Sequence, residues 1–150
     1  MATTLDLEFE KCLQFKKIRE FSRGKSLVNK ELESAKLDLK SARETFEAEN
    51  YKWSTIQCYY SMFHSARALL YAKSYREKSH QCLIEAIRAI YLEKGLLDYT
   101  LVEALQKAKT LREEADYYGE FSKENAGYLV EKGGEFLKKT KEVLKIKKDG

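Results

Sequence analysis

Proline is absent from this chain of 150 residues, and glycine occurs only seven times. Because helix interiors exclude proline, a chain of this length without any predicts an all-α protein. No apolar run approaches the ~18 continuous residues of a membrane-spanning helix. The first residues, MATTLDLEFEK, are acidic where the start of a signal peptide is basic. We therefore expect a cytoplasmic protein of one main domain with no membrane contact.

Cysteine and histidine are too few and too scattered for a metal site. Cys12, Cys58 and Cys82 form no CxxC pair, and their odd number and wide spacing predict reduced thiols. Cys58 and Cys82 lie among apolar residues, so we expect them to be buried. His64 has serine three residues before it, which excludes the Glu-x-x-His of a helical di-iron site. Phosphate-cradling glycine loops, nucleophile elbows and HExxH motifs are also absent. We expect no metal and no cofactor.

The composition that remains fits a helical bundle. Charged residues make up 35% and hydrophobic residues 43% of the chain, which is typical of a folded soluble domain rather than a disordered one. The net charge of +4 permits an anionic partner but equally fits a solvated surface of mixed charge. Ten tyrosines and seven phenylalanines favour a homodimer, because aromatic residues are enriched in interface cores.

Apolar periodicity predicts five or six helices, with the helix from Ser54 to Tyr75 at the centre of the bundle. Asn50 is read as a helix stop, and Ser54 with Gln57 as a capping box. Gly133-Gly134 predicts either a close helix approach or a bend. The expected helices cover residues 5–21, 29–48, 51–75, 80–94, 101–117 and a segment after Ser122, with N-caps at Ser79, Thr100 and Ser122.

A first polar group lies on the central helix. Tyr60, His64, Arg67 and Tyr71 follow one another at steps of four, three and four, so they share a helix face. This pattern indicates either an interior polar cluster whose hydrogen bonds are satisfied or a binding site.

A second polar group follows that helix. Arg76, Lys78 and His80 place positive charge around Ser79, at the start of the next helix, which suits an anion such as phosphate. The alternative is an exposed loop with ordinary basic residues.

The third polar group is the segment LREEADYYGEFS. Arg112 and Asp116 have the i, i+4 spacing of a helix ion pair, and Tyr117 and Tyr118 add two rings and two hydroxyls. One interpretation is a surface salt bridge beside a core tyrosine. The other is a patch that contacts phosphate or base, with Arg112 as the anion-binding fork.

These segments together resemble the HEPN domain, in particular small prokaryotic HEPN proteins encoded beside minimal nucleotidyltransferases. The resemblance rests on YYSMFHSARALLYAKSYREKSHQ, LREEADYY and SKENAGYLVEKGGEFL, and it covers roughly residues 32–144. It implies an up-and-down helical bundle that is commonly a homodimer. Many members are metal-independent RNases with a composite site across the dimer interface, and others bind nucleotides or act as the toxin of a toxin–antitoxin pair. We expect an N-terminal helix and flexible connection at 1–27, an HEPN-like bundle at 28–146 and a basic tail at 147–150.

The chain departs from the RNase members of that family at one position. Those members carry an arginine and, four to six residues later, a histidine that moves a proton. Arg112 matches the arginine, but Asp116 or Tyr117 occupies the place of the histidine, and neither side chain titrates near neutral pH as histidine does. Arg112, Asp116 and Tyr117 are thus the catalytic candidates, and whether the chain is an enzyme stays open.

Three hypotheses follow, in order of preference. The first is a HEPN-like module, part of a toxin–antitoxin pair, that binds a nucleotide, RNA or a nucleotidyltransferase partner. The second is a metal-independent endoribonuclease whose site lies at the dimer interface, with His64 or His80 brought near by folding. The third is a purely structural helical dimer. The candidate binding residues are Arg112, Asp116, Tyr117, Tyr118, His64, Arg67, Arg76 and His80.

Overall fold

The computed structural model describes residues 4–118 and 121–145, and the side-chain surroundings of 6–114 and 121–145 within them. The predicted all-α fold is confirmed, since six α-helices form the described part of the chain and its only sheet has two short strands. In order, the elements are α1 Thr4–Gln14, β1 Ile18–Glu20, α2 Gly24–Glu47, α3 Tyr51–Tyr71, β2 Tyr75–Glu77, α4 His80–Ile87, the π-helical turn η1 Arg88–Leu92, α5 Tyr99–Tyr118 and α6 Lys123–Val143.

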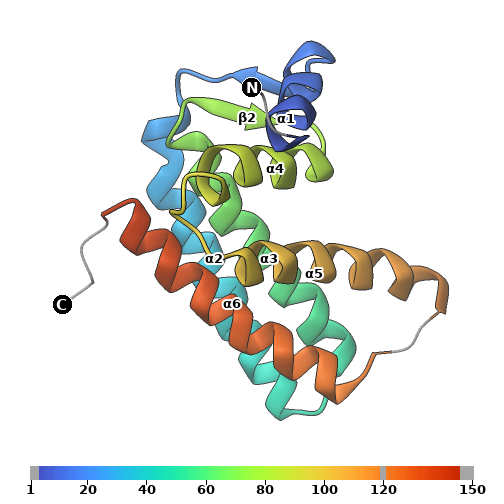
Figure 1. Cartoon of the computed structure of the whole chain (residues 1–150). Helices are drawn as coiled ribbons and strands as arrows, with labels where there is room; N and C mark the ends of the chain where they lie inside the picture. The colour runs from blue at the N-terminus through green and yellow to red at the C-terminus, as the bar shows by residue number, and fades with distance from the viewer. Residues whose placement is uncertain (1–3, 119–120, 146–150) are drawn as a thin grey trace.

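Helix α3 is the centre of the molecule, as its pattern predicts. It packs against α2, α4, α5, α6 and β2. Figure 1 shows α2, α3 and α6 side by side as three long helices, with α5 leaving them at a wide angle. The two strands, α1 and α4 gather at one end of this bundle. Side chains from β2, α4 and α5 can therefore meet on α3. No helix in the described ranges is long and apolar enough to cross a membrane.

Two buried serines bring α3 close to α2. Ser54 Oγ donates to the carbonyl of Ala42 at 2.9 Å, and Ser61 Oγ donates to the carbonyl of Ala35 at 2.8 Å. Both alanines are fully buried, so the helices meet at small side chains while the hydroxyls remain hydrogen-bonded.

The start of α3 differs from the sequence prediction. The left-handed residue after α2 is Glu49 with φ 62°, and the Asn50 amide donates to the carbonyl of Thr45 at 2.8 Å. The Asn50 side chain accepts a hydrogen bond from the amide of Trp53 at 3.3 Å and caps α3. Ser54 lies inside the helix and is not a capping residue. The capping-box interpretation fails because the Ser54 hydroxyl is used in packing against α2 rather than at a helix end.

The N-terminal segment also corrects the prediction of one helix over 5–21. Helix α1 ends at Gln14, and Lys16 adopts a left-handed conformation with φ 56°. The chain then forms β1, which pairs antiparallel with β2 in the register Ile18↔Glu77, Arg19↔Arg76 and Glu20↔Tyr75. The predicted end of the central helix at Tyr75 is wrong for the same reason, because Tyr75 begins β2. Burial of Ile18 favours the pairing of β1 with β2. The two strands are far apart in the sequence, so the local pattern did not predict their pairing.

The later helices follow the prediction more closely. Ser79 and Ser122 are N-caps, and their side chains accept hydrogen bonds from the amides of Cys82 and Asn125. The predicted helix at 80–94 divides into α4 and η1. Within η1 the Tyr91 hydroxyl donates to the carbonyl of Leu69 at 2.6 Å, and this buried bond ties the turn to α3.

The paired glycines of α6 lie at a close helix approach and do not interrupt the helix. A Cβ atom on Gly133 would lie 3.3 Å from Leu39 Cδ1, and one on Gly134 would lie 2.9 Å from Arg43 Nη2. Both contacts are with α2, so the absence of side chains at these positions lets α6 pack against that helix.

The cysteines are a second correction. Cys12 of α1 and Cys82 of α4 form a disulfide across 70 residues of sequence, so the prediction of reduced thiols is wrong for this pair. Cys58 is free and fully buried, as expected, and burial raises the pKa of its thiol to about 12. The pairing could not be read from the sequence because the β1–β2 contact brings α1 over α4.

Candidate functional site

The candidate residues meet along one face of α3. Positions 59, 60, 63, 64 and 67 recur at the three- and four-residue spacing of a helix face. The segment from β2 to the start of α4 brings Glu77 and His80 to this face, and α5 brings Arg112. The polar side chains divide into two groups, one at each end of the row.

Arg67 belongs to a structural ion pair. Its Nη2 lies 2.6 Å from Glu77 Oε2, and its Nε donates to both carboxylate oxygens at 3.3 and 3.2 Å. Glu77 is buried, and the guanidinium also lies 4.4 Å from the centroid of the Phe63 ring. Burial opposes the charged form of Arg67, but the hydrogen bond to Glu77 and the nearby charges of Glu77 and Glu31 together outweigh it, so the pKa of Arg67 is raised. Arg67 therefore holds β2 against α3.

His64 lies between carboxylates of α2. Its Nδ1 is 2.5 Å from Glu31 Oε2, and its Nε2 is 3.7 Å from Asp38 Oδ2. Burial raises the pKa of the Asp38 carboxyl, although His64 partly offsets this. Glu31 also lies 3.7 Å from Arg67. This end of the row is thus a hydrogen-bonded network that joins α2, α3 and β2, which matches the interior polar cluster among the alternatives.

His80 and Tyr59 form the centre of the other group. The Tyr59 hydroxyl lies 2.6 Å from His80 Nδ1, and the imidazole packs 4.5 Å from the ring centroid of Phe63. Burial lowers the pKa of His80; nearby Glu77 opposes this shift, whereas Arg112 and Arg67 add to it. Burial likewise raises the pKa of the Tyr59 hydroxyl well above its usual range. Near pH 7 we therefore expect a neutral imidazole bonded to a protonated phenol.

Arg112 completes this group from α5. Its guanidinium carbon lies 5.6 Å from the ring centroid of Tyr59 and 5.1 Å from that of Tyr60. It is close enough to lower the pKa of both Tyr59 and His80. We call Tyr59, Tyr60, Phe63, His80 and Arg112 the Tyr59–Arg112 cluster. Along α3, residues 59 and 67 are about 12 Å apart at 1.5 Å per residue, so the cluster and the Arg67 ion pair are neighbours in one row.

Other predicted site residues lie elsewhere. The Arg76 guanidinium lies 5.1 Å from the ring centroid of Phe21, on the strand pair and away from His80. The side chains of Asp116, Tyr117 and Tyr118 lie outside the described residues, so the Arg112–Asp116 pair stays a prediction. Two residues of the site were not singled out from the sequence, Tyr59 and Glu77. The only local signal for Tyr59 is its place beside Tyr60, and Glu77 has none.

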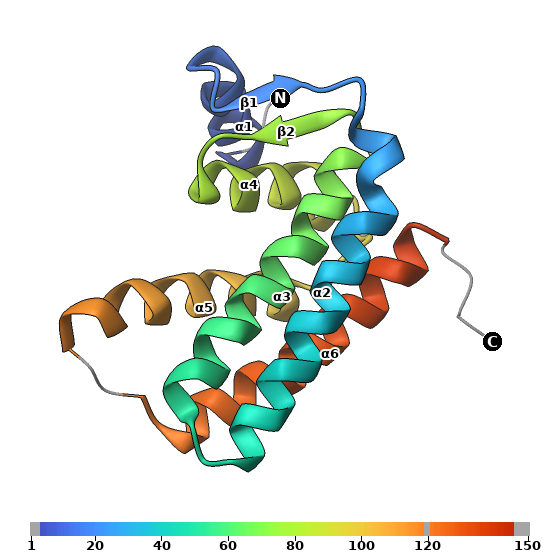
Figure 2. The same ribbon diagram turned by 180° about the vertical axis from the view of Figure 1, so that it is seen from behind.

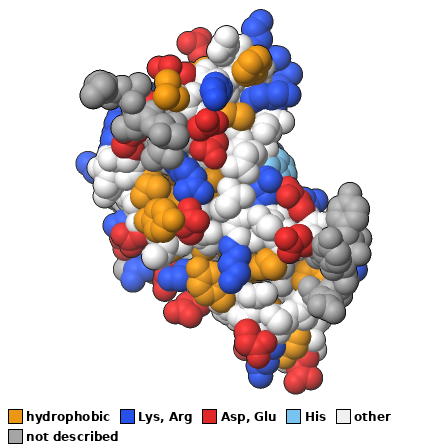
Figure 3. Space-filling view, turned by 45° about the vertical axis from the view of Figure 1, so that its right-hand side comes forward, with side chains coloured by type: hydrophobic (Ala, Val, Ile, Leu, Met, Phe, Trp, Pro, Cys, Tyr) orange, Lys and Arg blue, Asp and Glu red, His pale blue; other side chains and the backbone are white. Residues whose placement is uncertain are grey.

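The face drawn in Figure 3 is mixed in charge, with basic and acidic side chains interspersed over it. Among the residues that the structure describes, no three histidine, cysteine, aspartate or glutamate side chains are placed to hold a metal ion. The chemistry available here is that of an arginine, an imidazole, phenols and aromatic rings.

Comparison with models of protein families matches residues 28–148 to the HEPN domain. The chain belongs to the HEPN family. Its relatives include two Methanocaldococcus jannaschii proteins named "Putative toxin". One is 35% identical over 124 residues, which are 81% of this chain and 84% of the relative. The other is 28% identical over 130 residues, 81% of this chain and 97% of the relative. An Archaeoglobus fulgidus protein named "UPF0332 protein" is 33% identical over 108 residues, 71% of this chain and 86% of the relative.

The HEPN match confirms the resemblance seen in the sequence and leaves α1 and β1 before its first residue. In this HEPN chain the histidine nearest to Arg112 comes from another element. Arg112 lies on α5, whereas His80 begins α4, and the Tyr59 ring contacts both side chains. Folding therefore brings an arginine and a histidine together, although the sequence has no histidine four to six residues after Arg112.

Proposed function

We propose that the chain is a toxin-like HEPN module that binds a phosphate-bearing ligand, a nucleotide or single-stranded RNA, at the Tyr59–Arg112 cluster. The observation that supports this most is the place of the Arg112 guanidinium over the rings of Tyr59 and Tyr60. An arginine held on aromatic rings is pre-oriented, always charged and suited to phosphate oxygens. Tyr60 is partly exposed and offers a ring on which a base can stack.

The Tyr59–His80 hydrogen bond favours binding over catalysis. Because burial raises the pKa of Tyr59, its hydroxyl keeps the proton, and the tautomer that we propose is the one in which this hydroxyl donates to His80 Nδ1. The neutral imidazole then carries its own proton on Nε2. In this tautomer His80 offers a donor to a phosphate oxygen, whereas a general base needs a free lone pair.

Binding is tested with a fluorescein-labelled oligouridylate by fluorescence anisotropy and with ATP by calorimetry. We expect wild-type protein to bind at least one of the two probes. Arg112→Ala should weaken that binding about tenfold or more, as loss of a charge-assisted hydrogen bond does. Helical content, measured by circular dichroism, should stay unchanged because Arg112 is partly exposed.

Lys107 supplies the matched control. It also lies on α5, and its ammonium group is 4.7 Å from the ring centroid of Tyr128. Lys107→Ala removes one positive charge from the same helix and from a similar aromatic contact, so it should leave affinity within about twofold if binding is local to the cluster. Equal losses in the two variants, or no binding of either probe by wild-type protein, would reject the proposal.

A second candidate function is metal-independent RNA cleavage. It is supported by one observation: His80 has a lowered pKa and lies in the electrostatic range of Arg112. In the other tautomer the Nδ1 proton is donated to the Tyr59 hydroxyl, so the free lone pair of Nε2 can accept a proton, and an arginine can stabilise the phosphate that is attacked. Cleavage of RNA in the presence of EDTA that is lost in both His80→Gln and Arg112→Ala would place this function first.

The assembly of the protein belongs to the same proposal. We infer a homodimer, because the chain is rich in aromatic residues, and an antitoxin partner, because two relatives carry toxin names. The HEPN resemblance makes a nucleotidyltransferase the expected kind of partner. Trp53 and Leu37 support it, since both are large apolar side chains that are more than half exposed. Light scattering at micromolar concentration tests the dimer, and a purely monomeric mass would exclude it.

A further inference from the structure

The outward face of the β1–β2 pair carries four cations that oppose one another across the strands. Arg19 lies directly opposite Arg76, and the Lys78 amide donates to the Lys17 carbonyl at 2.8 Å, which makes these lysines the next pair. Residues two apart in a strand share a face, so all four do. All are exposed, and none forms an ion pair within the described residues. Opposed like charges destabilise a sheet, which indicates a surface that meets an anion.

Strand β1 also has an unpaired outer edge. In Figure 2, β2 lies on the side of β1 toward α4, α1 lies beside β1, and no other described strand pairs with the outer side of β1. The bond from Lys78 to Lys17 fixes which backbone groups face β2. By the alternation of an antiparallel pair, the N–H and C=O groups of Ile18 and Glu20 face away from it. Outward backbone groups of this kind are a template for an added strand.

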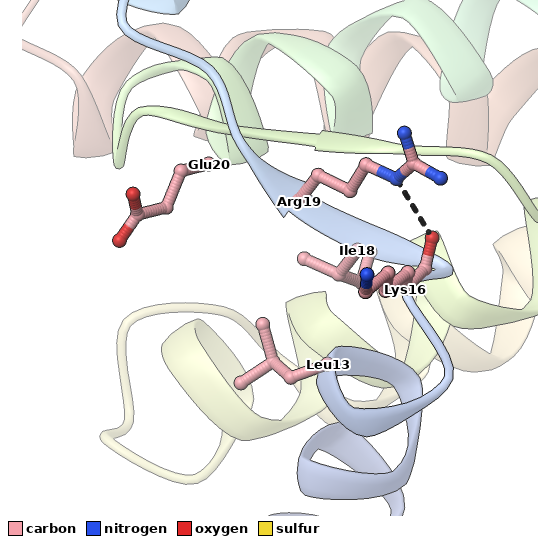
Figure 4. A pocket seen from close by; sticks show the side chains of 5 residues that line it. All are labelled: Leu13, Lys16, Ile18, Arg19 and Glu20. Carbon is pink, nitrogen blue, oxygen red and sulfur yellow. Dashed lines mark hydrogen bonds between the residues drawn. The ribbon is translucent and has the colours of Figure 1, made fainter.

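An apolar pocket of about 450 Å³ accompanies this edge (Figure 4). Its lining comes from the end of α1, the turn after it and β1: Leu13, Lys16, Ile18, Arg19 and Glu20. Leu13 and Ile18 give it an apolar floor, and Phe15 beside it is 67% exposed. Ile18 and Glu20 point to the same face of the strand, opposite to Arg19.

We propose that β1 binds an extended, acidic segment of a partner protein as a third strand. Alternate side chains of an added strand point to opposite faces. Carboxylates on one face of the segment meet Lys17 and Arg19, and apolar side chains on the other face enter the pocket of Leu13 and Ile18. Glu20 disfavours acidic residues on that inner face, so the segment alternates acidic and apolar residues. RNA would account for the cations but not for the outward backbone groups or the apolar floor.

This surface is distinct from the Tyr59–Arg112 cluster. Its strand edge and pocket are built by residues 13–20, which precede the region that matches the HEPN domain, and β2 with the residue after it adds only the cations Arg76 and Lys78. The two proposals can therefore fail separately, since Arg112→Ala leaves the strand edge intact.

The test uses wild-type full-length protein and a fluorescein-labelled nonapeptide of alternating glutamate and valine. Two analogues carry N-methyl groups, one on every valine and the other on every glutamate. An added strand hydrogen-bonds to β1 through alternate residues only. We expect the peptide to bind and one analogue to lose binding while the other keeps it. Loss on valine methylation indicates antiparallel addition, and loss on glutamate methylation indicates parallel addition.

Paired variants locate the contact on the protein. Glu20→Pro removes an outward N–H and leaves the bonds to β2, whereas Glu20→Gln removes the charge and keeps the N–H. Arg19→Glu reverses one of the four charges on the outward face of the β1–β2 pair. Lys40→Glu reverses a charge at an exposed position of α2, about 24 Å along that helix from its first residue. We expect Glu20→Pro and Arg19→Glu to weaken binding about tenfold or more, and neither control to weaken it more than about twofold.

Three results would overturn the proposal. They are no binding of the peptide to wild-type protein, equal binding of both methylated analogues, and binding of oligouridylate that Arg19→Glu abolishes while the peptide fails to bind. Circular dichroism checks that each variant is folded. The methylated analogues need no variant, so the result with wild-type protein decides the proposal even if a variant unfolds.

Discussion

The hydroxyl of Tyr59 on α3 lies 2.6 Å from Nδ1 of His80, the first residue of α4. This bond joins two elements that β2 already holds together through Glu77, and it fixes the imidazole beside the rings of α3. His80 is therefore oriented by its neighbours, as a group that meets a ligand must be. His64, on the same helix, is instead engaged by carboxylates of α2.

The lowered pKa of His80 predicts a loss of stability in mild acid. The folded-state pKa lies below the ordinary value of 6.5, so the unfolded state binds the proton more readily. Stability due to the neutral imidazole is complete above that value and falls as the pH drops through 6.5 toward the folded-state pKa. Denaturant unfolding between pH 8 and 5.5 should show a steeper decline for wild-type protein than for His80→Gln. Parallel curves would mean that His80 titrates alike in both states.

The Arg67–Glu77 pair predicts a large effect from a small change. Glu77→Gln keeps the shape of the side chain but replaces a charged acceptor that Arg67 contacts with both Nε and Nη2. We expect the free energy of unfolding to fall by about 2 kcal/mol, as for a hydrogen bond between charged groups. Urea unfolding measures it. Glu33→Gln, at an exposed position of α2, should change it by less than about 0.5 kcal/mol, and a similar loss there would argue against the pair.

The helical part of the fold could be predicted from the sequence because its signals are local. The absence of proline, the apolar stripes and the serine caps at 79 and 122 all act within one or two turns. The strands could not be predicted in this way. Ile18 and Glu77 pair across 59 residues, and each strand is three residues long, too short for an alternating pattern to stand out.

The candidate site was predictable in part. Arg112 and His80 belong to separate sequence groups, and only folding brings both to the Tyr59 ring. The face shared by His64 and Arg67 follows from helix spacing, but their acidic partners Glu31 and Glu77 come from other elements. Because these carboxylates pair with His64 and Arg67, this end of the row is a structural network. No local sequence pattern predicts which carboxylates form those pairs.

Two close contacts of α2 predict different outcomes for substitution of glycine by alanine, one between the start of α2 and the end of α3 and the other between α2 and α6. A Cβ atom on Gly24 would lie 2.6 Å from the carbonyl oxygen of Tyr71, so Gly24→Ala must displace backbone and should cost about 1–3 kcal/mol. At Gly133 the neighbour is the end of the Leu39 side chain, 3.3 Å away, which can move. The gain in helix propensity offsets that adjustment, so Gly133→Ala should be nearly neutral. Thermal unfolding distinguishes the two, and equal costs would contradict the assigned contact.

The Cys12–Cys82 disulfide predicts that reductant destabilises the protein. The bond closes a loop of 70 residues, and by the chain-entropy relation a loop of this length contributes about 4 kcal/mol. For a domain of this size the melting temperature should fall by roughly 10 °C when the bond is reduced. The measurement is thermal unfolding with and without reductant. Alkylation of the unfolded, unreduced protein should label Cys58 alone.

The control for that experiment is Cys12→Ser, which cannot form the bond. Its melting temperature should match that of the reduced wild-type protein and should not respond to reductant, because Cys58 is buried and has no partner thiol in the described structure. A fall on reduction in Cys12→Ser as large as in wild-type protein would show that reductant acts elsewhere. Labelling of all three cysteines without reduction would show that the α1–α4 bond does not form, and the N-terminal helix would then be held by apolar packing and the β1–β2 pair alone.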